Sequence, residues 1–110
     1  MNISGLRVRI IIQRNETVVD RYGNHKSVWV DYFTCWATPS TQTGSEGEAA
    51  AYEVEEDRLD FTVRWSSETA AVTAKGYRIL LGERVYNIVH VDDMGFRKRS
   101  RKFHAELTER

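Results

Sequence analysis

Apolar and polar residues alternate along the first part and the middle of the chain, which is the pattern of β-strands with one buried face. Residues 6–13, LRVRIIIQ, show this period, and so do residues 58–65, RLDFTVRW. Between them, residues 28–38 are rich in β-branched and aromatic side chains, which favour strands. We predict that this strand stops at Pro39, because proline cannot donate a hydrogen bond to a neighbouring strand.

The last third of the chain predicts three further strands in succession. Apolar runs at 78–81 and 85–91 are separated by Gly82-Glu83, and residues 92–95, DDMG, separate the second run from 101–107. Glycine supplies the positive φ that tight turns need, and aspartate favours turns by bonding its own backbone. The pattern is typical of a β-meander.

The remaining segments read as turns and loops. Residues 20–24, DRYGN, predict a turn. Residues 40–51, STQTGSEGEAAA, predict a long polar loop whose second half, 46–54, favours a short helix because glutamate and alanine are good helix formers. A loop of this length in a small domain is often functional. Residues 66–75 show little strand or helix signal.

Together these elements predict one all-β domain spanning residues 1–110, a small six-stranded barrel or sandwich with a polar loop at 40–52 and one short helix. The single cysteine, Cys35, excludes an internal disulfide and is expected as a small hydrophobe in a strand. We expect no membrane span and no signal peptide, since no apolar run is long enough for either.

Charge is balanced overall but segregated along the chain. The formal net charge is zero, from 16 basic and 16 acidic residues, which argues against a dedicated nucleic-acid binder. The predicted acidic interface residues are Glu46, Glu48, Glu53, Glu55 and Glu56, with Asp57 and Asp60 following them. The predicted basic interface residues are Arg97, Lys98, Arg99, Arg101 and Lys102. Two such faces suit head-to-tail association, and the alternative interpretation is two solvated faces that contact nothing.

The residues give little sign of catalysis. His25, His90 and His104 do not share a metal-ligand spacing, and no second cysteine is present to complete a zinc site. The glycines form neither a phosphate-binding loop nor a dinucleotide fingerprint, and Cys35 lacks a nucleophile signature. We therefore expect a protein that is not an enzyme and has no cofactor, no metal and no catalytic residue.

The basic segment leaves three interpretations open. Phe96 and Phe103 flank it, so it could follow a phosphate backbone while an aromatic ring stacks on a base. It could instead contact an acidic protein partner, or form a solvent-exposed turn that leads into a strand. The first interpretation gives the alternative function, a small-barrel nucleic-acid-binding protein that uses residues 96–103.

Several weak motifs in a fixed order resemble the head–tail joining, or head-closure, proteins of long-tailed bacteriophages. They are the opening LRVRIIIQR, Tyr22-Gly23, CWATP at 35–39, TVRW at 62–65, and RILLGERVYNIVHVDD at 78–93. The resemblance covers residues 3–107. The connection at 65–77 departs from the family pattern because it is less turn-like than expected.

The resemblance implies a structural virion protein of the phage neck, made in the bacterial cytoplasm. It implies a ring on the portal or connector that closes the DNA exit channel after packaging and offers an attachment surface for the tail. The expected partners are portal proteins, a tail-completion protein and further copies of this chain, with non-specific contact to packaged DNA and a monomer before assembly. The candidate channel-plug residues are Ser40, Thr41, Gln42, Thr43, Gly44, Ser45 and Gly47.

Overall fold

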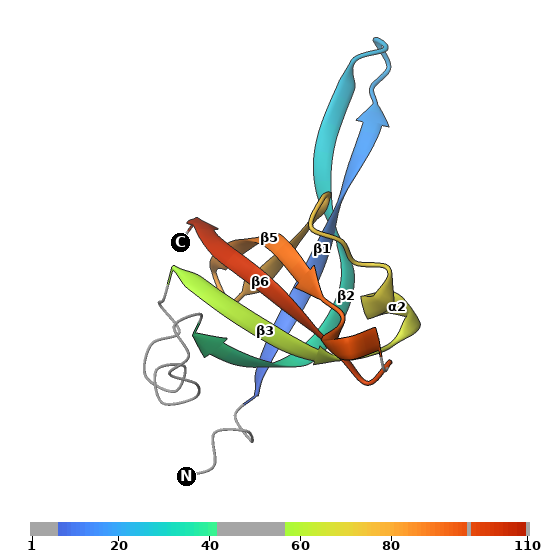
Figure 1. The fold of residues 1–110 in the computed structure, drawn as a ribbon. Coiled ribbons are helices and arrows are strands. Elements are labelled where there is room, and N and C mark those ends of the chain that lie inside the picture. The colour runs from blue at the N-terminus through green and yellow to red at the C-terminus, as the bar shows by residue number, and fades with distance from the viewer. Residues whose placement is uncertain (1–6, 42–56, 97, 110) are drawn as a thin grey trace.

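A computed structural model describes residues 7–41, 57–96 and 98–109 (Figure 1). Its elements are β1 (Val8–Val19), β2 (His25–Thr41), β3 (Arg58–Arg64), helix α2 (Ser67–Ala70), β4 (Tyr77–Leu81), β5 (Arg84–Asp92), the single 3₁₀ turn η2 (Met94–Phe96) and β6 (Ser100–Glu109). No helix in these ranges is long and apolar enough to span a membrane.

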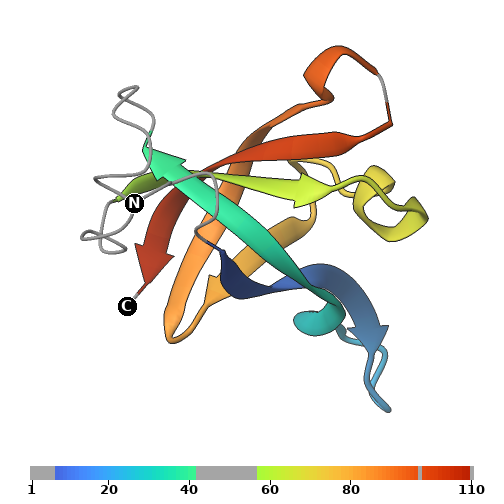
Figure 2. The same ribbon diagram turned by 90° about the horizontal axis from the view of Figure 1, so that it is seen from below.

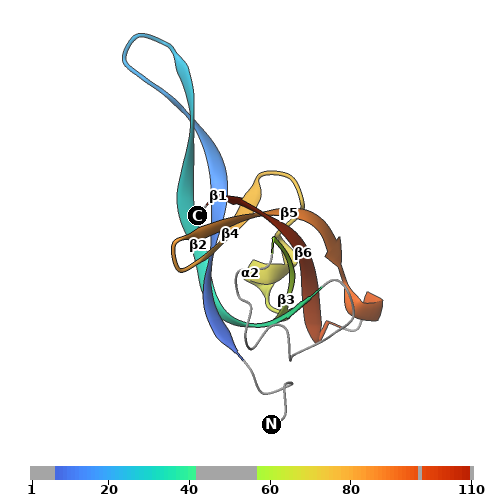
Figure 3. The same ribbon diagram turned by 90° about the vertical axis from the view of Figure 1, so that its left-hand side faces the viewer.

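The six strands form one antiparallel sheet that closes into a barrel in the order β1-β2-β3-β6-β5-β4. Strands β4, β5 and β6 pair consecutively, so the predicted meander is confirmed. Closure comes from β1, which pairs with β2 along one edge and with β4 over Ile11–Arg14 along the other. In Figure 3 the strands curl around a common centre. The predicted fold class, a small six-stranded all-β barrel with one short helix, is confirmed.

The barrel interior is filled by the apolar face that the alternation predicts. Leu59, Phe61 and Val63 of β3 are buried, as are Ile10 and Ile12 of β1. Val72, from the connection after α2, is also fully buried and joins this cluster. Aromatic packing adds to it: the rings of Phe61 and Tyr86 meet edge to face at 5.4 Å between centroids. The core therefore draws on every strand and on the α2 segment.

The first two strands are longer than predicted. They form a hairpin around the predicted turn at residues 20–24, where Gly23 has a φ of 83°. The predicted stop at Pro39 is wrong: β2 continues through Pro39, which is buried opposite Phe61 of β3. Among the described residues β1 pairs with β2 only as far as Ala37, so at Pro39 β2 has a described strand partner on one side only, and proline is tolerated there.

The start of the predicted loop needs correction, and the predicted helix is not tested by the structure. Ser40 and Thr41 belong to β2 and pair with Asp60 and Leu59, so the polar loop begins later than Ser40. The helix predicted at 46–54 lies outside the described residues. A helix does occur in the connection that showed no helix signal, because Ser66 caps α2 and exchanges hydrogen bonds with Thr69 in a capping box.

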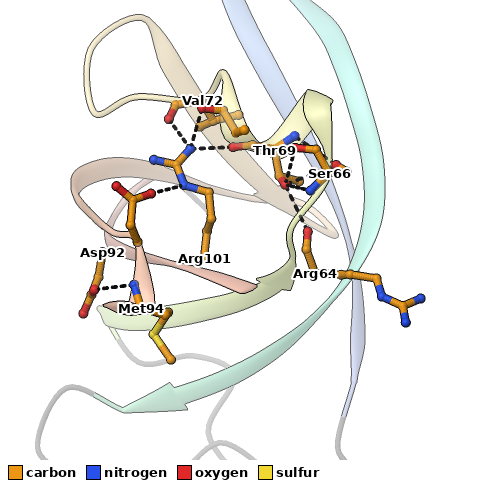
Figure 4. Close-up of polar contacts among 9 residues, drawn as sticks. Arg64, Ser66, Thr69, Val72, Asp92, Met94 and Arg101 are labelled. Carbon is orange, nitrogen blue, oxygen red and sulfur yellow. Dashed lines mark hydrogen bonds and ion pairs between the residues drawn. The ribbon is translucent and has the colours of Figure 1, made fainter. Parts of the chain in front are cut away.

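One end of the barrel is held by Arg101, a residue that is only 8% exposed (Figure 4). Its guanidinium Nη1 donates to the carbonyl oxygens of Thr69, Ala70 and Val72 at 2.6, 3.0 and 2.9 Å. Its Nε donates to Asp93 at 2.8 Å. Arg101 therefore joins the end of α2 to the β5–β6 connection, and Figure 2 shows these two segments on the same side of the barrel.

We predict that Arg101→Lys lowers the free energy of unfolding by about 2 kcal/mol and the thermal midpoint by roughly 10 °C, because an ammonium cannot reach all four acceptors at once. Urea denaturation followed by tryptophan fluorescence measures the change. The matched control is Arg99→Lys, an exposed arginine two residues away, for which we expect a change within about 0.5 kcal/mol. Equal stability of the two variants would contradict the structural role of Arg101.

Candidate interaction surfaces

The structure describes only part of the predicted charged interface. Glu46, Glu48, Glu53, Glu55, Glu56 and Arg97 lie outside the described residues, as do the plug candidates Gln42, Thr43, Gly44, Ser45 and Gly47. Of the acidic residues that follow, Asp57 is exposed, whereas Asp60 is buried.

The basic run divides into surface and interior residues. Lys98 and Arg99 are exposed, and the Lys98 ammonium lies 5.8 Å from the centre of the Trp65 ring. Lys102 is half-buried and is paired with Thr62 and Asp92 of the flanking strands. Arg101 is bound inside the barrel end, so we leave it out of any contact surface. The run is thus a mixture of exposed cations and one structural arginine.

Phe103 is not available for stacking on a base. It is fully buried in the core, on the same inward face of β6 as Arg101 and Ala105. The alternation of β6 accounts for both findings, because residues two apart on a strand face the same way. The nucleic-acid interpretation therefore loses its Phe103 ring and one of its cations.

His104 and His90 contact neighbouring side chains on the barrel, whereas His25 is exposed in β2. His104 Nδ1 and Asp60 Oδ1 lie 2.7 Å apart, and the His104 ring stacks on His90 with 5.4 Å between centroids. Within the described part of the chain, no three metal-ligating side chains gather. Cys35 lies half-buried in β2, and burial raises the pKa of its thiol to about 11, which keeps it protonated and weakly nucleophilic at neutral pH.

A basic groove crosses the outer wall of the barrel over β2 and the end of β3, and Arg7, which precedes β1, borders it. It is an open pocket of about 510 Å³ that includes Arg7, Trp36 and Arg64 in its lining, and none of the described lining residues is a carboxylate. Trp36 is 53% exposed, and the Arg9 guanidinium lies 5.4 Å from the centre of its ring. The exposed cations Lys98 and Arg99 lie beside Trp65, which follows Arg64 in the chain. The Trp65 amide donates a hydrogen bond to the Arg99 carbonyl.

Strand register explains why these side chains gather. Arg9 pairs with Trp36 across β1–β2. Ala37 pairs with Val63 across β2–β3, so the same antiparallel register sets Arg64 beside Trp36. Ala37 and Val63 point into the core, and their neighbours therefore point outward. The groove is thus an aromatic ring between two arginines on a rigid sheet.

A second surface is the arm, residues 15–29, which is the part of the β1–β2 hairpin that projects beyond the barrel (Figures 1 and 3). Its tip exposes apolar side chains: Val18 is 41%, Val19 58% and Tyr22 79% exposed. Large apolar groups gathered at the end of a projecting element are typical of an interaction site.

The turn at the tip of the arm is well ordered. Asp20 Oδ1 accepts hydrogen bonds from the backbone amides of Tyr22 and Asn24 at 2.8 and 2.9 Å. The pKa of the Asp20 carboxyl lies below its usual value, chiefly because the backbone amide of Asn24 donates a hydrogen bond to it. The tip therefore presents Tyr22 from a fixed turn.

The base of the arm is fixed to the barrel by a bulge. The β1–β2 register shifts between Ile12 and Gln13, which leaves Tyr32 as the additional residue of β2. Its hydroxyl donates to the Glu68 carbonyl of α2 at 2.8 Å, and burial raises the pKa of the phenol. Nearby, Arg78 donates to Gln13 at 2.8 Å and lies over the Trp29 ring at 4.4 Å. The arm therefore leaves the barrel in a defined direction.

Sequence reasoning missed both surfaces. The turn at residues 20–24 was found, but nothing in the local pattern shows that the strands on either side extend beyond their barrel partners. The groove could have been found from the alternation itself, which sets Arg7 and Arg9 on one outward face and Trp36 and Arg64 on the strands beside it. What was lacking was the order of those strands.

Comparison with known proteins assigns the fold to a family. A sequence model described as phage head completion protein matches residues 1–108. The solution structure of protein SF1141 from Shigella flexneri 2a is similar, with a TM-score of 0.67 and 25% identity over 97% of this chain and 96% of that one. A chain from the virion of a native gene transfer agent particle has the same fold, with a TM-score of 0.60 and 20% identity over 93% of this chain and 94% of that one.

No curated protein sequence matches the chain significantly. The family assignment therefore depends on the sequence model, which covers nearly the whole chain, and on the barrel shared with the solved structures. The chain belongs to the phage head completion protein family, and its role is a structural one at the head and neck of the virion.

Proposed function

We propose that this protein assembles as a ring on the portal or connector after DNA packaging, closes the DNA exit channel and provides the tail attachment surface. The observation that carries the proposal is its family membership over residues 1–108. The structure supports it with a closed barrel from which an arm with an apolar tip projects. A stable body with one extended contact element suits a component held between larger assemblies.

Ring assembly requires contacts between different surfaces of neighbouring copies, because a head-to-tail contact repeats until the circle closes. The basic groove offers a surface for a neighbouring copy, and the arm is left for the adjacent ring. In Figure 1 the arm tip lies at one end of the molecule, and the ends of β2 and β3 lie toward the other. Copies of a barrel that carries separate contact elements at its two ends can be arranged around an axis without any change in the shape of the barrel.

The channel-plug role is proposed for the loop that follows β2, namely Gln42, Thr43, Gly44, Ser45 and Gly47. The pairing of Thr41 with Leu59 holds the two strands that flank this loop side by side. Ser40 and Thr41 therefore act as its anchor on the barrel and not as part of the plug. A polar, glycine-containing sequence suits a segment that becomes ordered on assembly.

The arm is proposed to contact the adjacent ring of the neck. Tyr22, Val19 and Val18 form a small apolar tip, and tyrosine is among the residues that contribute most to protein interfaces. Insertion of such a tip into a pocket on the portal or tail ring would join successive rings. The tip is already ordered by Asp20, so little conformational entropy would be lost on binding.

The test of head closure uses DNA-filled heads from the phage that lack this protein. Purified protein is added, and the fraction of DNA that stays nuclease-resistant is measured together with tail joining. We expect the DNA to be retained and tails to attach. Heads that bind the protein and still release their DNA would contradict channel closure, and heads that never bind it would contradict its place on the portal.

We predict that Tyr22→Ser weakens attachment to the adjacent ring about tenfold or more, while leaving the fold intact, because it removes the largest exposed apolar group of the tip. Binding to purified connector-bearing heads measures the effect. Arg21→Ala, beside Tyr22 in the same turn, is the matched control and should bind like the wild type. Unchanged binding by Tyr22→Ser would show that the arm does not carry this contact.

A further inference from the structure

We infer that the basic groove binds the acidic segment 42–56 of a second copy of this chain. The inference rests on the proposed ring assembly and names the contact that would hold neighbouring copies together. Of the basic run at 97–102 it keeps only Lys98 and Arg99, at the margin of the groove, because Arg101 is buried and bonded within its own barrel.

Charge complementarity carries the inference. Segment 42–56 reads QTGSEGEAAAYEVEE and contains glutamates but no lysine or arginine. The groove and its margin present the opposite charge: Arg7 and Arg64 line it, Arg9 lies beside Trp36, and Lys98 and Arg99 follow at its edge. No carboxylate lines the groove, so nothing in its described lining competes with an incoming glutamate.

The groove also offers more than charge. Trp36 is a large, half-exposed apolar surface beside the Arg9 guanidinium. The acidic segment carries alanines, Tyr52 and Val54 among its glutamates, so a bound segment has apolar groups to cover the Trp36 ring. Arginines that are already positioned by ring stacking lose less freedom when they bind carboxylates. An acidic peptide with an aromatic residue is therefore the chemistry that fits.

The positions of the two surfaces favour a neighbouring copy as the source. Segment 42–56 joins the barrel next to the Thr41–Leu59 pair, whereas the groove surrounds the Ala37–Val63 pair, at the other end of the β2–β3 ladder. Each copy thus carries its acidic segment at one end of the ladder and its basic groove at the other. This polarity leaves one unused surface at each end of a chain of copies until the ring closes.

The experiment measures paramagnetic broadening between two differently labelled copies at low ionic strength and high protein concentration. One copy contains no nitrogen-15 and carries a nitroxide at position 53, attached through the substitution Glu53→Cys. Its native thiol is removed by Cys35→Ala. The other carries nitrogen-15 and no nitroxide. We expect the Trp36 indole signal of the second copy to broaden, while that of Trp29, in the arm, stays sharp and acts as the internal control. High salt should abolish the effect.

Charge reversal tests the specificity of the contact. Arg9→Glu with Arg64→Glu on the nitrogen-15 copy should weaken binding at least tenfold. Both residues are exposed, so we expect the fold to persist. An unchanged Trp29 signal would show that it does. Glu55→Lys with Glu56→Lys on the nitroxide copy should restore the broadening of this reversed groove. Failure of the restoration would overturn the pairing.

The other outcomes each contradict the inference. Broadening only when nitroxide and nitrogen-15 are in the same molecule would assign the segment to its own groove. Absence of broadening in both arrangements would leave the groove without this occupant. A Trp36 shift on adding a single-stranded oligonucleotide, without broadening between copies, would assign the groove to nucleic acid. Because this test uses purified protein alone, its result is separable from that of the head-closure assay.

Discussion

Closure of the barrel by β1 is the constraint on which the rest of the structure depends. This strand pairs with β4 over only four positions, Ile11–Arg14, and with β2 along its whole length. The short pairing removes the free edges of the sheet, which would otherwise invite unspecific strand association. The long pairing continues past the barrel and becomes the arm. A single strand thus closes the body and carries its main projection.

The two outward surfaces depend on this arrangement in different ways. The arm takes its direction from the bulge at Tyr32, whose hydroxyl is bonded to α2, and from the Arg78 contacts at its base. The groove depends on adjacent strands, because Arg9, Trp36 and Arg64 come together only when β1, β2 and β3 pair in the observed register. Contact surfaces built on a closed sheet keep their geometry in the unassembled protein.

The fold followed from the sequence where alternation and turn chemistry agreed. The inward set of β3 and the β4–β6 meander were predicted because period-2 patterns bounded by glycine and aspartate turns permit few other structures. Helix α2 was missed because its capping box has threonine at the third position, Thr69, where glutamate would give the usual signal. Pro39 was misjudged because its tolerance depends on which strands flank it, and a sequence does not show strand order.

The candidate site was harder to predict than the fold, and Arg101 shows why. As one of a run of cations, Arg101 was predicted to lie on a surface. The strand period instead sets Arg101 on the inward face of β6 with Phe103 and Ala105, which follow it by two and four residues. The local charge pattern and the strand period gave opposite answers, and the period was correct. The contributions of residues 42–56 remain predictions, since they lie outside the described residues.

The central claim is that this barrel acts in the virion as one unit of a ring at the portal. Electron cryomicroscopy of DNA-filled heads, reconstructed with and without added protein, tests it most directly. The account predicts additional density below the portal into which copies of the barrel fit side by side as a closed ring, with the arms directed to an adjacent ring. Isolated copies that make no contact with each other, or an unchanged portal exit, would contradict it.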